Sequence, residues 1–375
     1  MTVPAQTRSG GRNLGIDLLR VISVAAVVIG HAWGGMPGDQ YLQIWRMPLF
    51  FFLAGFFFST SRSFTGELRA RGRGLVLPYV VWLLLLSLAV LAMAQTAFPF
   101  EDGTLTGALI GGARTDMPFL AFWFISVLFF AALLLRVVLT LPWWVGALVG
   151  LSGLTLAQLP DSAMSYTPLG IGLAPACMAF MLAGHWFGRF MRTPRGHNLP
   201  AKPWIGLLFV AVGFGGVVTG AESMNIKWSG FGTFLLSPAL AILISIGLVL
   251  VFSTAVNTVL GGAAPGVPPG RDASAHKNPQ RTAPRWGRGV GVVISELVRT
   301  ATVVVFFHAI VLYVLLRFFE LENPVLRTVV TLLICWAVGI AINRTPLALP
   351  LNGVSRSPAR QSRQSQADGK IASKT

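Results

Sequence analysis

Long runs of apolar residues separated by short polar segments dominate the chain. A helix needs about 20 apolar residues to cross the hydrocarbon core of a bilayer, which is about 30 Å thick. The second apolar segment is short and aromatic, which leaves open a tilted or partly re-entrant path. The pattern predicts an all-α fold, a polytopic bundle of about ten transmembrane helices. The ten segments are 14–33, 44–60, 75–98, 118–139, 142–158, 169–190, 203–219, 233–260, 290–318 and 325–343.

The composition also indicates a polytopic membrane protein. Hydrophobic residues make up 54% of the chain, charged residues only 11%, and the mean hydropathy is +0.69. With the N-terminus in the cytoplasm, 22 of the 29 Lys and Arg residues fall on cytoplasmic segments and five on external loops. Cytoplasmic loops carry such an excess of positive charge. We therefore expect both termini in the cytoplasm and the chain in the inner (plasma) membrane.

The formal net charge of +16 does not indicate nucleic-acid binding, because the basic residues lie between apolar spans and not on one polar domain. This distribution is typical of anchoring against an anionic cytoplasmic leaflet of the lipid bilayer. The two cysteines, Cys177 and Cys335, both lie within apolar spans. Their positions favour buried thiols over a disulfide or a metal framework.

The domain organisation follows from the same pattern. Residues 1–13 are predicted to be a short cytoplasmic N-tail, and residues 14–345 a single membrane domain. Residues 261–289 are rich in Gly, Pro and Arg and predict a flexible cytoplasmic loop. Residues 346–375 predict a disordered basic C-tail. No cleavable signal peptide is expected, because the basic start runs directly into a full-length span.

Two ionisable residues, Arg20 and His31, interrupt the first span. Eleven positions are close to three helical turns, so both side chains leave the same face of the helix, about 16 Å apart along its axis. An Arg inside a membrane helix is costly, and Asp17 stands three residues earlier, where it can pair with Arg20. Alone, Arg20 can equally reach lipid headgroups, and His31 can be a packing residue. Together, the two residues predict a polar path along one face of this helix.

Later motifs combine with Arg20 and His31 into an ordered set. The set resembles acyltransferase family 3, the polytopic membrane acyltransferases that modify bacterial surface sugars and lipids, over roughly residues 14–345. Two positions depart from the family pattern and concern the substrate class. Arg46 stands where related sugar acetylases often have His, and Ala54 replaces a serine. The matching residues are Arg20 and His31; Pro48 to Phe56; Arg73, Pro78 and Tyr79; Trp123 and Phe124; and Phe306, Phe307 and His308.

The resemblance implies an O-acyltransferase that moves a short acyl group, acetyl, from acyl-CoA to a hydroxyl of a carbohydrate, polysaccharide precursor or glycolipid. We expect no tightly bound cofactor and no metal. His31, largely neutral at pH 7, is the candidate general base. Arg20, nearer the cytoplasm, is the second catalytic candidate and can bind the phosphates of CoA. The further candidates for contact with substrate are Asp17, Arg46, Arg73, Trp123 and His308.

Other interpretations stay open at this point. A secondary transporter or flippase would also have ten spans with buried charges, although no internal repeat is evident. A membrane scaffold that recruits partners through its basic loops would leave Arg20 and His31 unexplained. As a lone histidine, His308 can be a packing residue. No GxSxG motif occurs, which favours direct acyl transfer over a covalent enzyme intermediate.

Overall fold

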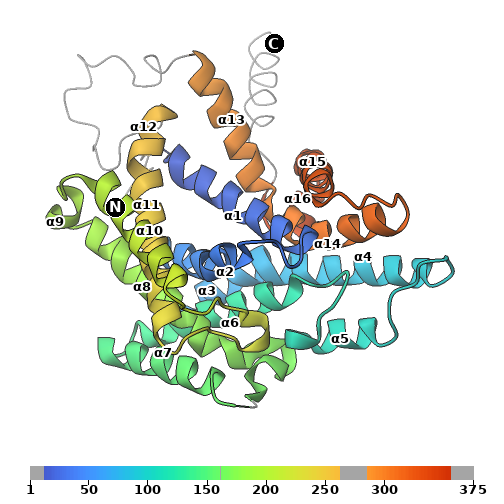
Figure 1. Ribbon diagram of the computed structural model, residues 1–375, viewed down its shortest axis with the longest axis horizontal. Coiled ribbons are helices and arrows are strands. Elements are labelled where there is room, and N and C mark those ends of the chain that lie inside the picture. The colour runs from blue at the N-terminus through green and yellow to red at the C-terminus, as the bar shows by residue number, and fades with distance from the viewer. Residues whose placement is uncertain (1–11, 161, 262–284, 356–375) are drawn as a thin grey trace, which may run out of the picture.

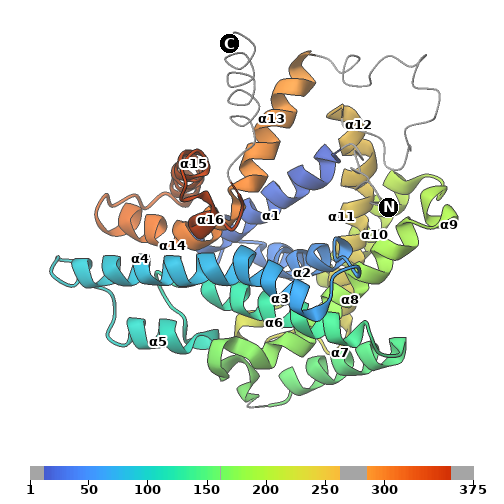
Figure 2. The same ribbon diagram turned by 180° about the vertical axis from the view of Figure 1, so that it is seen from behind.

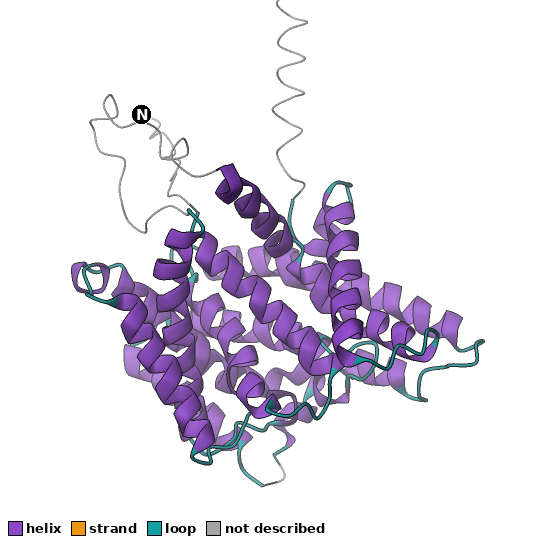
Figure 3. Ribbon diagram, turned by 45° about the horizontal axis from the view of Figure 1, so that its top comes forward, coloured by secondary structure: helices purple, strands orange, loops and turns teal. Residues whose placement is uncertain are grey.

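The computed structural model describes residues 12–160, 162–261 and 285–355. Every regular element in this part of the chain is a helix, as Figure 3 shows. Its only β-type pairing is an isolated bridge between Asn225 and Gly230. The predicted all-α class is therefore confirmed.

The described helices are joined by loops, and long ones connect α4 to α5 and α10 to α11 (Figures 1 and 2). The short elements η1 and η6 are π-helical, and η2 to η5 are 3₁₀ turns. The bounds are α1 Leu14–Ala32, α2 Asp39–Phe56, α3 Phe64–Arg71, η1 Gly72–Val76, α4 Leu77–Met93, α5 Thr104–Ile110, η2 Gly112–Arg114, α6 Phe122–Val138, α7 Trp143–Ala157, η3 Ala163–Tyr166, η4 Pro168–Leu173, α8 Ala174–Met191, α9 Pro194–His197, α10 Lys202–Val218, η5 Ile226–Trp228, α11 Leu236–Val251, η6 Phe252–Val256, α12 Asn257–Val259, α13 Arg285–Arg299, α14 Ala301–Arg317, α15 Pro324–Asn343 and α16 Ala348–Asn352.

Five helical segments of the described chain are long and apolar enough to cross a membrane, or six if the bent pair α13 and α14 forms one span. The helices α6, α7 and α10 are apolar but shorter. Each of the ten predicted segments overlaps a helix or a helix pair. The number of crossings and the cytoplasmic position of both termini stay predictions.

Two of the predicted spans differ in shape from a simple crossing helix. The segment predicted at 290–318 bends by 66° between α13 and α14. The second predicted span, α2, begins at Asp39 and not at residue 44, so that its first turns are polar. These turns interact with other polar groups, because Gln43 bonds both Asp39 and, at 3.0 Å, the hydroxyl of Ser223.

The close packing of α2 against α8 fixes the position of α2 in the bundle. At Gly55 an added Cβ atom would lie 1.8 Å from the backbone oxygen of Met181, and at Gly184 one would lie 2.0 Å from that of Phe52. The two backbones are therefore in direct contact, which only glycine permits. Across the bundle, Phe51 of α2 packs edge-on against Phe124 of α6 with ring centres 5.2 Å apart.

The prediction that the disordered C-tail begins at residue 346 is wrong for the first residues of that segment. Residues 348–352 form α16, which packs against α4 at the site where the Trp82 indole N–H donates to the Leu351 carbonyl at 2.8 Å. The Asn352 side chain also donates to the Asn343 side-chain oxygen at 2.7 Å. Buried backbone carbonyls need such donors, so this segment is helical and attached. Residues 356–375, most of the N-tail and most of the predicted loop 261–289 lie outside the described residues.

Candidate active site

A cavity of about 240 Å³ lies where the end of α1 meets α2, α6 and the connection between α10 and α11. Its wall contains a histidine, two cations and several aromatic side chains. The lining residues are Val27, His31, Arg46, Met47, Phe50, Leu120, Ala121, Trp123, Phe124, Met224, Asn225, Ile226, Lys227, Trp228 and Val305.

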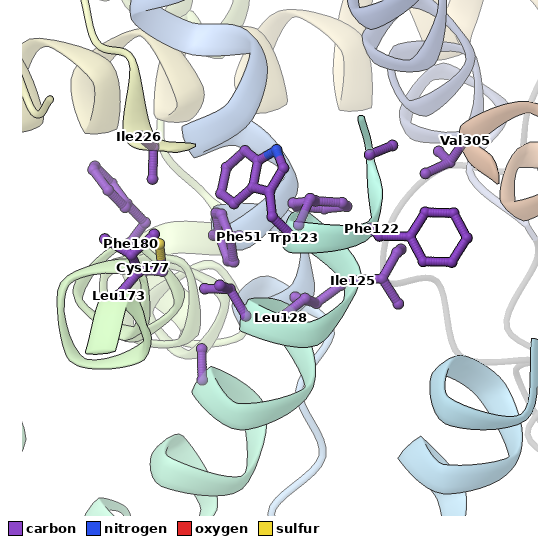
Figure 4. Packing of buried hydrophobic residues seen from close by; sticks show 14 of the residues in the cluster. Phe51, Phe122, Trp123, Ile125, Leu128, Leu173, Cys177, Phe180, Ile226 and Val305 are labelled. Carbon is purple, nitrogen blue, oxygen red and sulfur yellow. The ribbon is translucent and has the colours of Figure 1, made fainter. Parts of the chain in front are cut away.

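The start of α6 forms the aromatic part of this wall. Trp123 and Phe122 leave the helix on different sides, as Figure 4 shows. Trp123 lines the cavity, whereas Phe122 does not line it and is part of the buried core. Phe122 packs edge-on against Phe306 of α14, with ring centres 4.8 Å apart. Trp123, predicted to contact substrate, therefore lies in the cavity wall, and its neighbour in the sequence holds α6 in place.

His31 lies in the cavity wall, and His308 stands behind it. The two rings have centres 5.3 Å apart and planes inclined by 30°. His308 is fully buried, and its Nδ1 lies 2.9 Å from the Val304 carbonyl oxygen. Because a carbonyl only accepts, Nδ1 carries the proton and Nε2 is the bare nitrogen. That nitrogen has no hydrogen-bond partner among the described residues. His308 thus contacts His31 and does not line the cavity.

Arg46 reaches the cavity across the backbone of α1. Its Nη1 atom lies where a Cβ at Gly30 would stand, 1.5 Å away, so the guanidinium rests on the residue next to His31. The same Nη1 lies 3.8 Å from Oδ1 of Asp39, about two turns earlier in α2. The absence of a side chain at Gly30 therefore allows Arg46 of α2 to reach the cavity.

Lys227 is the functional candidate that the sequence did not single out. Its ammonium donates to the Thr115 carbonyl and lies 4.9 Å from the centre of the Trp228 ring. Burial lowers the pKa of Lys227 from its usual value, and the charge of Asp116 acts in the opposite direction. One signal for Lys227 was available in the sequence. The predicted external loops contain only five Lys and Arg residues, and Lys227 is one of them.

The remaining predicted residues lie elsewhere. Arg20 pairs with Asp17 at 3.8 Å and stands 4.3 Å from the centre of the Phe57 ring. Asp17 also pairs with Arg12. Arg73 is exposed in η1. The structure thus brings His31, Arg46 and Trp123 to one cavity, with His308 behind it, whereas Arg20, Asp17 and Arg73 do not line that cavity.

The described residues offer no cluster of three His, Cys, Asp or Glu side chains that could hold a metal ion. Cys177 and Cys335 are both free and buried. The chemistry available at the cavity is therefore that of an imidazole beside two cations, held between apolar helices.

The described part of the chain is all-helical, and several of its helices are long and apolar enough to cross a membrane, which defines the class of multi-pass membrane proteins. The chain belongs to the acyltransferase 3 family, whose acyltransferase domain matches residues 13–344, nearly the whole chain. It is thus a membrane acyltransferase that transfers groups other than aminoacyl groups, and the resemblance seen in the sequence is confirmed. Comparison with curated proteins and with solved structures gives no match.

Proposed function

We propose that this membrane O-acyltransferase moves an acetyl group, or another short acyl group, from acyl-CoA to a hydroxyl of a sugar, polysaccharide precursor or glycolipid. The observation that carries the proposal is the position of His31 in a cavity next to cations and aromatic rings. A small apolar pocket with a few convergent polar groups is the usual form of a substrate site. We place the enzyme in the inner membrane with both termini in the cytoplasm.

In the proposed reaction, a ring nitrogen of His31 takes the proton of the acceptor hydroxyl. The oxygen attacks the thioester carbonyl carbon, the carbon–sulfur bond breaks, and the CoA thiolate leaves and takes up the proton from His31. General base catalysis requires an unprotonated nitrogen within hydrogen-bond reach of the hydroxyl.

We assign the phosphates of the donor to the other end of α1. Arg20 lies about 16 Å along the helix from His31, and the long pantetheine arm of CoA separates its thioester from its phosphates by a comparable stretch. Asp17 would hold Arg20 in place, and Arg73 would attract the polyanion from the aqueous side. The Asp17–Arg20 pair and the exposure of Arg73 are compatible with these roles.

The function is tested by mass spectrometry of envelope glycans and lipids from cells with and without this protein. We expect one species to lose the mass of a single acyl group and to regain it when the wild-type gene is restored. The lost mass identifies the acyl chain, and the affected species identifies the acceptor. Identical envelope spectra from both cell types under conditions of expression would argue for transport or scaffolding instead.

His308 is expected to position His31. Replacing His308 by Phe keeps a ring in place but removes the bare Nε2 atom beside His31. We expect kcat to fall about 10- to 100-fold, with the KM for acyl-CoA nearly unchanged, because small misplacements of a catalytic group have effects of this size. The pH dependence of kcat should shift as well, since the environment of the base changes.

The measurement is steady-state acyl transfer by the purified variant across a pH series, together with its melting temperature. A variant that loses thermal stability but keeps the wild-type kcat and pH profile would assign His308 to packing alone.

A further inference from the structure

The charged side chains in the wall of the cavity are both cations. Arg46 and Lys227 line it, and no described Asp or Glu does. The carboxylates that act on these cations, Asp39 and Asp116, lie outside the wall. A ligand in the cavity therefore meets the positive groups first.

Asp39 neutralises Arg46 only in part. Their closest atoms are 3.8 Å apart, beyond hydrogen-bond length, and both Nη1 of Arg46 and Oδ1 of Asp39 lack a hydrogen-bond partner among the described residues. The other oxygen of Asp39 already accepts from Gln43. A guanidinium has five N–H donors in a planar fork, which suits carboxylate and phosphate. Arg46 thus keeps donors available for an anion.

The hydrogen bonding of Lys227 also leaves donors available. The one hydrogen bond described for its ammonium goes to Thr115, and an ammonium has three donors. Its acidic neighbour Asp116 is exposed, so water and salt screen that charge. Lys227, by contrast, is half-buried, with its ammonium next to Trp228, and a partly desolvated cation attracts an anion more strongly.

The rest of the wall fits one sugar ring. Trp123 and Trp228 offer flat apolar faces next to the cations. The volume of about 240 Å³ lies below the range of drug-sized pockets, so it accepts one small group and not a length of polymer.

We infer that the acceptor is an anionic sugar, whose carboxylate or phosphate is held by Arg46 and Lys227 while its hydroxyl faces His31. This inference rests on the proposed function and names the acceptor class of that same site. CoA is also a polyanion, but its phosphates are a pantetheine arm away from the thioester. When the thioester is at His31, the anion beside Arg46 and Lys227 must therefore come from the acceptor.

Binding without any donor tests the inference. The full-length protein in nanodiscs is titrated with octyl β-glucuronide and with octyl β-glucoside, which differ only in the carboxylate. Binding is followed by the change in tryptophan fluorescence, to which Trp123 and Trp228 contribute among the eleven tryptophans of the chain. Glucose 1-phosphate and glucose form the second matched pair. We expect each anionic probe to bind about tenfold more tightly than its neutral partner, the effect of one charge-assisted hydrogen bond. Equal affinities within both pairs, or no binding of any probe, would overturn the inference.

Substitutions of the two cations show which residues cause the preference for the anionic probes. Arg46→Gln and Lys227→Gln should each remove most of it, whereas the charge-conserving Arg46→Lys and Lys227→Arg should keep part of it. The matched control is Arg317→Gln, which removes an exposed charge that does not line the cavity and should leave the preference intact. A preference that persists in both glutamine variants would place the anion site elsewhere.

A donor measurement separates the two sources of the anion. The KM for acetyl-CoA should be unchanged in Arg46→Gln and Lys227→Gln, and CoA should not displace octyl β-glucuronide. A raised KM for acetyl-CoA together with displacement by CoA would assign the cations to the donor and sink the inference. If the protein transfers no acyl group at all, the proposed function fails, while the binding preference still decides the ligand class.

Discussion

His31→Ala is expected to abolish acyl transfer, with a loss of about 10²- to 10⁴-fold in kcat, the range that general acid–base groups supply. His31 is the only described residue of the cavity wall whose side chain is a good base near neutral pH. Alanine also opens the space in front of His308. The bare Nε2 of His308 belongs to a ring that stands behind the wall, so it cannot replace the lost base in the same position.

The measurement is transfer of radiolabelled acetyl groups from acetyl-CoA by purified protein, with folding checked by thermal unfolding and size-exclusion chromatography. His197→Ala is the matched control, because His197 is exposed beyond α8 and does not line the cavity. Full activity in a well-folded His31→Ala variant would remove His31 from the chemistry.

Gly184→Ala is expected to cause a large loss of stability. The added methyl group would lie 2.0 Å from the Phe52 backbone oxygen and 3.0 Å from the backbone nitrogen of Phe56. Backbone cannot move aside as a side chain can, so α8 and α2 must separate. Overpacking of this kind costs at least about 2 kcal/mol. Activity should fall with stability, because α2 carries Arg46 and Phe50 into the cavity.

The matched control is Gly215→Ala in α10, where an added Cβ meets nothing within 4 Å. Alanine is the better helix former by about 1 kcal/mol, so this variant should be as stable as the wild type or more so. The two variants are compared by thermal unfolding in the same detergent. Equal melting temperatures would show that the α2–α8 contact is looser than described.

The sequence was a good guide to local structure because each membrane helix satisfies its own backbone hydrogen bonds and needs only an apolar length. All ten predicted segments overlap helices for this reason. It was a poorer guide where a helix changes direction or where a segment attaches to others. The 66° bend between α13 and α14 and the packing of α16 against α4 both depend on neighbours distant in the chain.

The candidate site shows the same division. Arg46, Trp123 and His308 were found through motifs, yet only the fold shows which of them meet His31. Lys227 escaped notice because its role depends on how the connection between α10 and α11 folds over the cavity, and no hydrophobic period describes such a loop.

By itself, the sequence determined the membrane class, the helices and the acyltransferase 3 family, since these follow from apolar length and from short motifs in a fixed order along the chain. Only the tertiary structure decided that His308 stands behind His31, that Arg46 crosses Gly30 and that Lys227 completes a cationic wall. The physical reason is that these contacts join residues from separate helices and loops, whose relative positions are set by packing and not by any local pattern.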